Sequence, residues 1–268
     1  MSDAPVTELP PVLERDYTIL LNDVGPDGEL RSWIFFDFLQ DIAARHAELL
    51  GCGMSRLRDL GIIWVLSRIR LRIDSFPSFG DTLRIRTWPS GFQKLFATRQ
   101  YQVTSLTSGR EIASGSSFWL TLDFHSLRPI PPARTVNGLL PENKDRPFYF
   151  PDLGKLPAVE ELTPVCHTAG QSVIDYNDHV NNAIYARYTQ DWLASVHGGP
   201  VKIRDIQLNF NHAVKFGQTM QCGGILNGDG SFAVSGSVDG ANVFQSSGHL
   251  AGGPEAQGDG KKSQNSFI

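Results

Sequence analysis

Two stretches of the chain place apolar residues at helical spacing. The first covers residues 33–50, which Ser32 can cap and Gly51 can end. The second opens at Asn181 or Asn182, either of which can cap a helix, and closes at Gly198-Gly199. The side chains that share one face are Phe35, Phe38, Leu39, Ile42, His46 and Leu49 in the first stretch, and Ile184, Tyr185, Tyr188, Trp192 and Leu193 in the second. The pattern predicts two amphipathic helices, each with one face toward a core.

Each predicted helix is followed by runs of β-branched and aromatic residues, broken by turn residues. The predicted strands are residues 15–22 before the first helix, 62–73, 81–88, 96–105 and 111–124 after it, and 202–210, 218–226, 231–238 and 243–250 after the second. Phe79-Gly80-Asp81-Thr82-Leu83 parallels Phe216-Gly217-Gln218-Thr219-Met220, at the same place after each helix. This match indicates an internal duplication.

Prolines divide the chain into two halves. Seven of them lie between Pro129 and Pro157, where they disfavour a long helix or a central strand. We therefore expect a first domain at residues 1–137, a proline-rich linker at 138–160 and a second domain at 161–251. Residues 252–268 are rich in Gly, Gln and Lys and are expected to be a disordered tail. The predicted class is α+β, with each half a curved antiparallel sheet around one long helix.

Composition narrows the possible partners. The 268 residues carry a formal net charge of −4, which gives no general attraction to nucleic acid or to anionic membranes. No run approaches the ~20 apolar residues of a membrane span, and residues 1–13 lack the features of a signal peptide. Cys52, Cys166 and Cys222 form no CxxC motif and no paired framework. We expect a cytoplasmic protein without a metal or another cofactor.

The segment before the second helix carries the candidate chemistry. Asp175, Asn177 and His179 alternate along what the pattern predicts to be a short extended segment. The helix that follows offers unpaired backbone N–H groups, which suit a developing oxyanion. An acid/base pair beside such a site is what acyl transfer to water requires. A lone D-x-N-x-H can also serve only the local hydrogen bonds of a turn.

The longer string D-x-N-x-H-V-N-N-x-x-Y, from Asp175 to Tyr185, resembles the signature of the acyl-ACP thioesterase family. Further resemblances are His46-Ala47, the run Ile63-Trp64-Val65-Leu66-Ser67-Arg68, and the run from Trp119 to Asp123 followed by Arg128-Pro129. The resemblance implies two tandem hotdog domains, the first holding the acyl chain and the second catalytic. It implies a catalytic set of Asp175, Asn177 and His179, and substrate-binding residues Asn181, Asn182, Trp64 and His46. The position of His46 on an apolar helix face also fits a core histidine.

The chain departs from the family at one segment. Plant members carry an acid and a cysteine where this chain has Ala213 and Val214, so the resemblance gives no thiol nucleophile here. Cys222, eight residues on, is interpreted as a core residue. The activation of water is then left to Asp175 and His179. If the strand continued through Ala213, His212 would point away from the face that the missing acid would occupy.

The predicted function is hydrolysis of fatty acyl-ACP to free fatty acid and holo-ACP. An acyl-CoA thioesterase and a non-catalytic acyl-binding protein are the alternatives. Five arginines alternate along two predicted strands and form a candidate basic face for the acidic carrier protein: Arg68, Arg70, Arg72, Arg84 and Arg86. A solvated outer sheet face explains them equally well. Two domains in one chain can complete the site internally, and a homodimer is left open.

Overall fold

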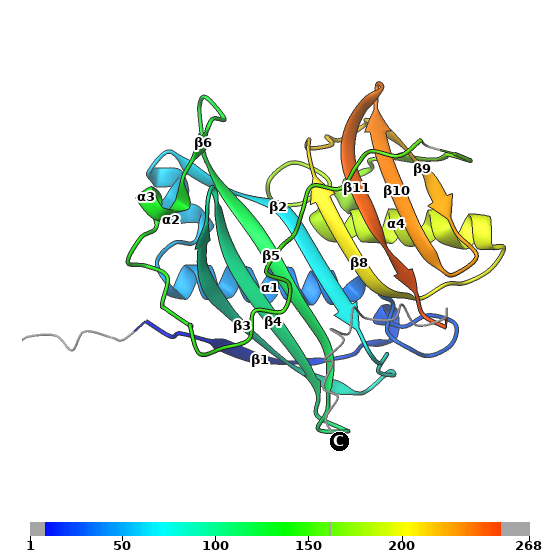
Figure 1. The fold of residues 1–268 in the computed structure, drawn as a ribbon, viewed down its shortest axis with the longest axis horizontal. Coiled ribbons are helices and arrows are strands. Elements are labelled where there is room, and N and C mark those ends of the chain that lie inside the picture. The colour runs from blue at the N-terminus through cyan, green and yellow to red at the C-terminus, as the bar shows by residue number, and fades with distance from the viewer. Residues whose placement is uncertain (1–8, 161, 253–268) are drawn as a thin grey trace, which may run out of the picture.

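The computed structural model describes residues 9–160 and 162–252 (Figure 1). Two long helices, α1 (Ile34–Leu49) and α4 (Asn182–His197), lie on the same side of one large antiparallel sheet. The sheet has eleven strands, and those of each half curve around the helix of that half. This arrangement is the predicted α+β architecture. The predicted tail falls outside the described residues from residue 253 onward.

The strands of the first half are β1 (Leu13–Thr18), β2 (Ile62–Ile73), β3 (Thr82–Gln93), β4 (Phe96–Ser105), β5 (Glu111–Asp123) and β6 (Pro129–Ile130). Those of the second half are β7 (Val165–Thr168), β8 (Ile203–Phe210), β9 (Thr219–Leu226), β10 (Ser231–Val238) and β11 (Ala241–Leu250). The short helical elements are η1 (Leu21–Asp23), α2 (Met54–Asp59), α3 (Pro132–Thr135) and η2 (Gln171–Val173). The strand order is β1-β3-β4-β5-β2-β8-β11-β10-β9-β7, with β6 beside β5.

The two halves are related by an approximate two-fold axis. From one edge to the centre the order is β1-β3-β4-β5-β2, and from the other edge it is β7-β9-β10-β11-β8, so each strand has an equivalent in the other half. At the centre, β2 pairs with β8. The two predicted repeat segments make the same contacts, because Gly80 N–H donates to Ile19 O at 3.1 Å and Gly217 N–H donates to Ala169 O at 2.8 Å. The predicted internal duplication is therefore confirmed. At the axis, Arg70 pairs with Gln207.

The helix ends were predicted with one error. Gly51 and Gly198 follow α1 and α4 with positive φ values of 70° and 80°, as helix-ending glycines do. Asn181 caps α4, since its Oδ1 accepts the N–H of Ala183 at 2.8 Å, a cap worth about 1 kcal/mol. The expected cap at Ser32 is wrong. Its buried hydroxyl instead accepts the N–H of Ile203 at 3.0 Å and joins the two halves.

The proline-rich linker crosses the outer face of the sheet, opposite the helices (Figure 1). Its backbone adds hydrogen bonds to buried polar side chains on this face of the sheet. Tyr149 N–H donates to Gln100 Oε1 at 3.1 Å, and Phe150 N–H donates to Ser116 Oγ at 3.0 Å. Further on, Gly154 O accepts the side-chain N–H of Gln207 at 2.8 Å. The linker thus covers the central strands of both halves.

Candidate active site

The D-x-N-x-H residues form a tight turn, so the predicted extended segment is wrong. Asp175 N–H donates to His179 O at 2.9 Å, and Asp178 N–H donates to Asp175 O at 3.0 Å. The carboxylate of Asp175 accepts the N–H of Asn177 at 2.8 Å, a local bond that favours a turn over a strand. Asp178 adopts a left-handed conformation with φ 60°. Because the chain reverses here, Asp175 and His179 meet.

The pair of Asp175 and His179 is the chemical centre of this turn. His179 Nδ1 lies 3.5 Å from Asp175 Oδ1, and their side chains are 26% and 13% exposed. His179 Nδ1 also lies 3.3 Å from Val180 O. Asn177 is exposed at the tip of the turn, and its side chain makes no hydrogen bond with the described residues. The structure therefore brings together two of the three predicted catalytic residues, while Asn177 stays apart.

The start of α4 leaves one backbone donor open next to this pair. The N–H of Ala183 donates to the cap Asn181, and the N–H of Ile184 donates to Asn181 O at 3.0 Å. The N–H of Asn182, at the first position of the helix, has no acceptor in the part of the chain that the structure describes. It adds a hydrogen-bond donor to the partial positive charge of the helix N-terminus. This group is the candidate oxyanion donor.

The segment after β8 borders the turn but is not a strand. Asn211 and His212 both donate their N–H groups to Val243 O, at 2.9 and 3.2 Å, after β8 has ended at Phe210. Val214 O accepts the N–H of Val180 at 2.8 Å, so Ala213 lies one residue from contact with the turn.

Ala213, at the position of the family's acid, and its neighbour His212 have different surroundings. Ala213 is exposed, at the place of the family's acid. His212 instead lines a groove of about 810 Å³ with linker residues Lys155, Leu156, Pro157 and Ala158. His212 therefore faces the linker side of this segment. Cys222 is fully buried, as predicted for a core residue.

The two first-half residues that were expected to bind substrate differ in burial. Trp64 is half-buried, donates its indole N–H to Cys52 O at 2.9 Å, and meets Trp119 edge to face at 6.5 Å. His46 is fully buried. Its Nδ1 accepts from Arg99 at 3.0 Å, so its Nε2–H donates to Pro10 O at 2.9 Å. Burial first, and then Arg99, lower the pKa of His46 to about 4. His46 is a neutral core histidine, and both of its nitrogens are used, so the expected role in substrate binding is not supported.

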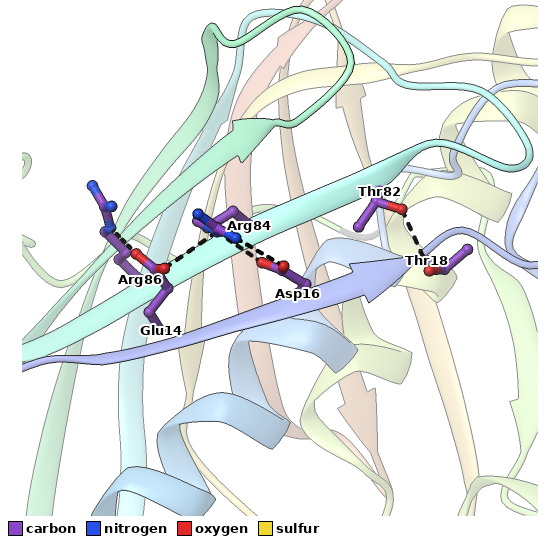
Figure 2. Close-up of polar contacts among 6 residues, drawn as sticks. All are labelled: Glu14, Asp16, Thr18, Thr82, Arg84 and Arg86. Carbon is purple, nitrogen blue, oxygen red and sulfur yellow. Dashed lines mark hydrogen bonds and ion pairs between the residues drawn. The ribbon is translucent and has the colours of Figure 1, made fainter.

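The predicted basic face consists of paired arginines. Figure 2 shows Arg84 between Asp16 and Glu14, with the Asp16 contact at 2.8 Å, and Arg86 bound to Glu14. On β2, the carboxylate of Asp205 accepts two hydrogen bonds from Arg70, at 3.0 and 2.8 Å. The remaining partners are Asp74 for Arg72, at 2.9 Å, and the linker carbonyl of Leu153 for Arg68. Each guanidinium of this candidate basic face already has an acceptor, and the carboxylate partners offset much of its positive charge.

Two other arginines lie next to the turn. Arg58 of α2 is exposed, and its guanidinium carbon lies 5.8 Å from the centre of the Tyr176 ring. Tyr176, at the tip of the turn, is 80% exposed. Arg56 lies on the same short helix and is also exposed. Neither arginine has an ion pair with a described residue. Arg58 thus places a positive charge, with no carboxylate partner among the described residues, beside the turn.

The first half contains the same turn without the same chemistry. Gly25 N–H donates to Glu29 O at 2.9 Å, as Asp175 does to His179, and Gly28 has the φ of 76° that corresponds to Asp178. Gly25 and Glu29 stand where the second half has its acid and its imidazole. Lys202 reaches this turn and pairs with Asp27 at 2.9 Å and with Glu29. The Asp–His pair belongs to the second half alone.

Two further properties bear on function. Among the described residues, no three His, Cys, Asp or Glu side chains gather as metal ligands would. No helix in residues 9–160 and 162–252 has the length and apolar character needed to span a membrane.

Comparisons with known proteins agree on one family. The model of the acyl-ACP thioesterase N-terminal domain matches residues 10–133, and that of the acyl-ACP thioesterase C-terminal domain matches residues 169–234. A chloroplastic palmitoyl-acyl carrier protein thioesterase of Arabidopsis thaliana is 27% identical over 187 residues, which are 65% of this chain and 45% of the relative. An oleoyl-acyl carrier protein thioesterase of the same plant is 23% identical over 188 residues, which are 64% of this chain and 52% of the relative. The chain spans about half the length of the curated relatives it matches.

Solved structures share the fold across nearly the whole chain. An acyl-ACP thioesterase from Bacteroides thetaiotaomicron superposes with a TM-score of 0.76 at 22% identity, covering 89% of this chain and 97% of the other. The 12:0-ACP thioesterase from Umbellularia californica gives 0.78 at 17% identity, with 89% and 96% covered. These matches confirm the predicted tandem hotdog fold.

Proposed function

The chain belongs to the acyl-ACP thioesterase family, and from this premise we propose that it hydrolyses fatty acyl-ACP to a free fatty acid and holo-ACP. One observation carries the proposal. Asp175 and His179 face each other 3.5 Å apart, beside the open N–H of Asn182 at the start of α4. A base, a second proton-transfer group and an oxyanion donor are the parts that thioester hydrolysis requires.

The steps follow from the position of each group. The N–H of Asn182 binds the thioester carbonyl oxygen and stabilises its negative charge as water attacks, a contact worth about 3–4 kcal/mol in other oxyanion holes. Asp175 accepts one proton from the attacking water. The C–S bond then breaks, and His179 passes the proton from Asp175 to the leaving thiolate of the carrier, which returns both groups to their starting states. With Ala213 and Val214 at the family's acid and cysteine positions, water is the nucleophile in this mechanism.

The carrier protein needs a docking surface that holds its thioester near Asp175. We place it over α2, because Arg56 and Arg58 are exposed and are not paired with carboxylates among the described residues, and because Arg58 contacts Tyr176 of the turn. An acidic carrier is attracted to such a surface before contact. The paired arginines of β2 and β3 offer less, since their carboxylate partners offset their charge.

The test is a steady-state hydrolysis assay with acyl-ACP and acyl-CoA of several chain lengths. Asp175→Ala and His179→Ala should each lower kcat by about 10²- to 10⁴-fold. Asp27→Ala, in the equivalent turn of the first half, is the matched control and should retain the wild-type rate. Near-wild-type turnover in both second-half variants would show that the site is assigned wrongly. Faster hydrolysis of acyl-CoA would favour the alternative carrier, and binding without hydrolysis would favour an acyl-binding protein.

The docking surface has its own test. The double variant Arg56→Glu and Arg58→Glu should raise KM for acyl-ACP, most strongly at low salt, and leave a small thioester unaffected. Arg110→Glu makes the same kind of charge change in the turn between β4 and β5 and serves as the control. Equal changes in KM for both substrates would count against carrier docking on α2.

A further inference from the structure

Gln40 and Gln190 occupy equivalent places on the two central helices. Val24 and Ile174 form the isolated β-bridge at the turn of their own half, with Leu30 and Val180 as partners. Gln40 follows Val24 by the same number of residues as Gln190 follows Ile174. The Oε1 atoms of both glutamines are buried and accept no hydrogen bond from the described residues. Only four buried side-chain atoms in the described chain share this property, and these are two of them. A buried acceptor without a partner is unusual, and each case calls for an explanation.

Gln190 shows which way such a glutamine faces. A cavity of about 870 Å³ lies between the turn at residues 25–29 and α4 of the other half, and its lining includes Asp27, Glu29, Gln190 and Lys202. The side-chain N–H of Gln190 donates to Val201 O at 2.8 Å, which holds the carboxamide at this cavity. The helix of the second half thus presents its glutamine to the turn of the first half.

The two-fold relation places Gln40 opposite the catalytic turn. Exchanging the halves carries the turn at 25–29 onto the turn at 175–179 and carries α4 onto α1, and the two helices pack against each other. By this relation Gln40 lies on the side of α1 toward Asp175 and His179, as Gln190 lines one cavity with Asp27 and Glu29. The same exchange carries Val201 onto Trp64. Arg70 and Gln207 are equivalent residues at the axis, and Trp64 precedes Arg70 by as many residues as Val201 precedes Gln207. Trp64 is thereby placed beside Gln40.

We propose that Gln40 is a further catalytic group of this active site, supplied by the first half, and that its Oε1 orients the attacking water. This rests on the proposed hydrolysis. One O–H of the water donates to Gln40 Oε1 and stays intact, while Asp175 takes the proton of the other O–H. The hydroxide oxygen then bonds to the thioester carbon. Gln40 neither gains nor loses a proton.

A neutral acceptor suits this position better than a second carboxylate would. Two carboxylates that share one water repel each other, and one of them then takes up a proton. An amide oxygen accepts a hydrogen bond from the water and adds no negative charge beside Asp175. Gln40 thus fills part of the role that the missing acid at Ala213 leaves open, from the opposite side of the site.

The test compares Gln40→Met with Gln190→Met, since methionine keeps the length of the side chain and removes the acceptor. Gln40→Met should lower kcat by about 10- to 100-fold, with KM within about threefold of wild type, because an unoriented nucleophile reacts more slowly. Gln190→Met, the matched control on the other helix, should stay within about twofold. Thermal unfolding of both variants shows whether the fold is retained.

Gln40→Glu provides the second measurement. It restores an oxygen acceptor, so it should be at least about tenfold faster than Gln40→Met, with a pH profile that differs from that of wild type. If wild type hydrolyses no acyl thioester, the proposed function itself fails. If wild type is active and Asp175→Ala is not, but Gln40→Met turns over like wild type, then the role of Gln40 is overturned and the proposed function stands. Equal losses in Gln40→Met and Gln190→Met would also overturn it, because only Gln40 faces the catalytic turn.

Discussion

Asp37, in the first turn of α1, is a carboxylate whose charge destabilises the folded protein. It is partly buried and has no hydrogen bond or ion pair with a described residue. Burial first, and then the nearby Asp23, raise the pKa of Asp37 from 3.8 to about 6. At neutral pH the group is ionised in a place that disfavours its charge. Asp37→Asn keeps the shape of the side chain and removes the charge, so we expect it to stabilise the protein.

The sign and size of the effect follow from the pKa. Because the folded pKa lies above the unfolded value, the native state binds more protons between about pH 4 and pH 6, and stability falls as pH rises through this range. A shift of roughly two units corresponds to about 3 kcal/mol as an upper bound. Solvent screens a partly exposed group, so we expect about 1–2 kcal/mol above pH 7 and almost none at pH 4. In a protein of this size, that raises Tm by about 2–8 °C.

Thermal unfolding of wild type and Asp37→Asn at pH 4 and pH 8 tests this reasoning. Asp41, on the same helix, is the matched control. Burial alone would raise the pKa of Asp41, but hydrogen bonds from Arg45 and Tyr17 lower it, so Asp41→Asn should destabilise the protein at pH 8. An Asp37→Asn variant that is no more stable at pH 8, or equally more stable at both pH values, would refute the argument.

Two further predictions concern His46 and the segment after β8. Because the pKa of His46 is lowered to about 4, its neutral form stabilises the fold at neutral pH, and this contribution is lost as pH falls from about 6.5 to about 4. His46→Leu should remove that acid sensitivity in a plot of Tm against pH, and should cost about 3 kcal/mol because the buried Arg99 loses one of its acceptors and keeps Thr87 Oγ at 3.2 Å. Ala213→Glu should raise kcat several-fold, since an exposed carboxylate there stays ionised next to the turn, while His212→Ala should stay within about twofold. A large loss of kcat in His212→Ala, with the fold intact by circular dichroism, would show that His212 has taken over the role of the missing acid.

The sequence predicted the helices well because their signals are local. The apolar stripe and Gly51 placed α1 at residues 33–50, against Ile34–Leu49 in the structure. The turn at Asp175 was missed because alternating polar residues also fit a strand. What decides the conformation is a single bond from Asn177 N–H to the Asp175 carboxylate, together with a left-handed Asp178. Spacing alone shows neither.

Other features depend on contacts between distant residues. The arginines of β3 are neutralised by Glu14 and Asp16 of β1, and Arg70 of β2 by Asp205 of β8, so the alternation of arginines on each strand hid their pairing. Nothing in the sequence singled out Gln40, because a polar residue on a helix is common. Its significance appears only when the two halves are superposed. Comparing equivalent positions of the two halves, starting from the repeat at Phe79 and Phe216, is the sequence signal that could have found it.

The central strand pair bears on how freely the two halves could exchange partners. Its register sets Arg68 opposite Asn209, Arg70 opposite Gln207 and Arg72 opposite Asp205. If two copies of the first half met through β2 about the same axis, Arg70 would face Arg70 and Arg68 would face Arg72. Like charges directly opposite each other on neighbouring strands destabilise the pairing. The first half is therefore unsuited to self-association along this edge, and β8 supplies the uncharged amides and the single carboxylate that β2 lacks. The side chains of β2 and β8 thus make the two halves complementary to each other and not to copies of themselves.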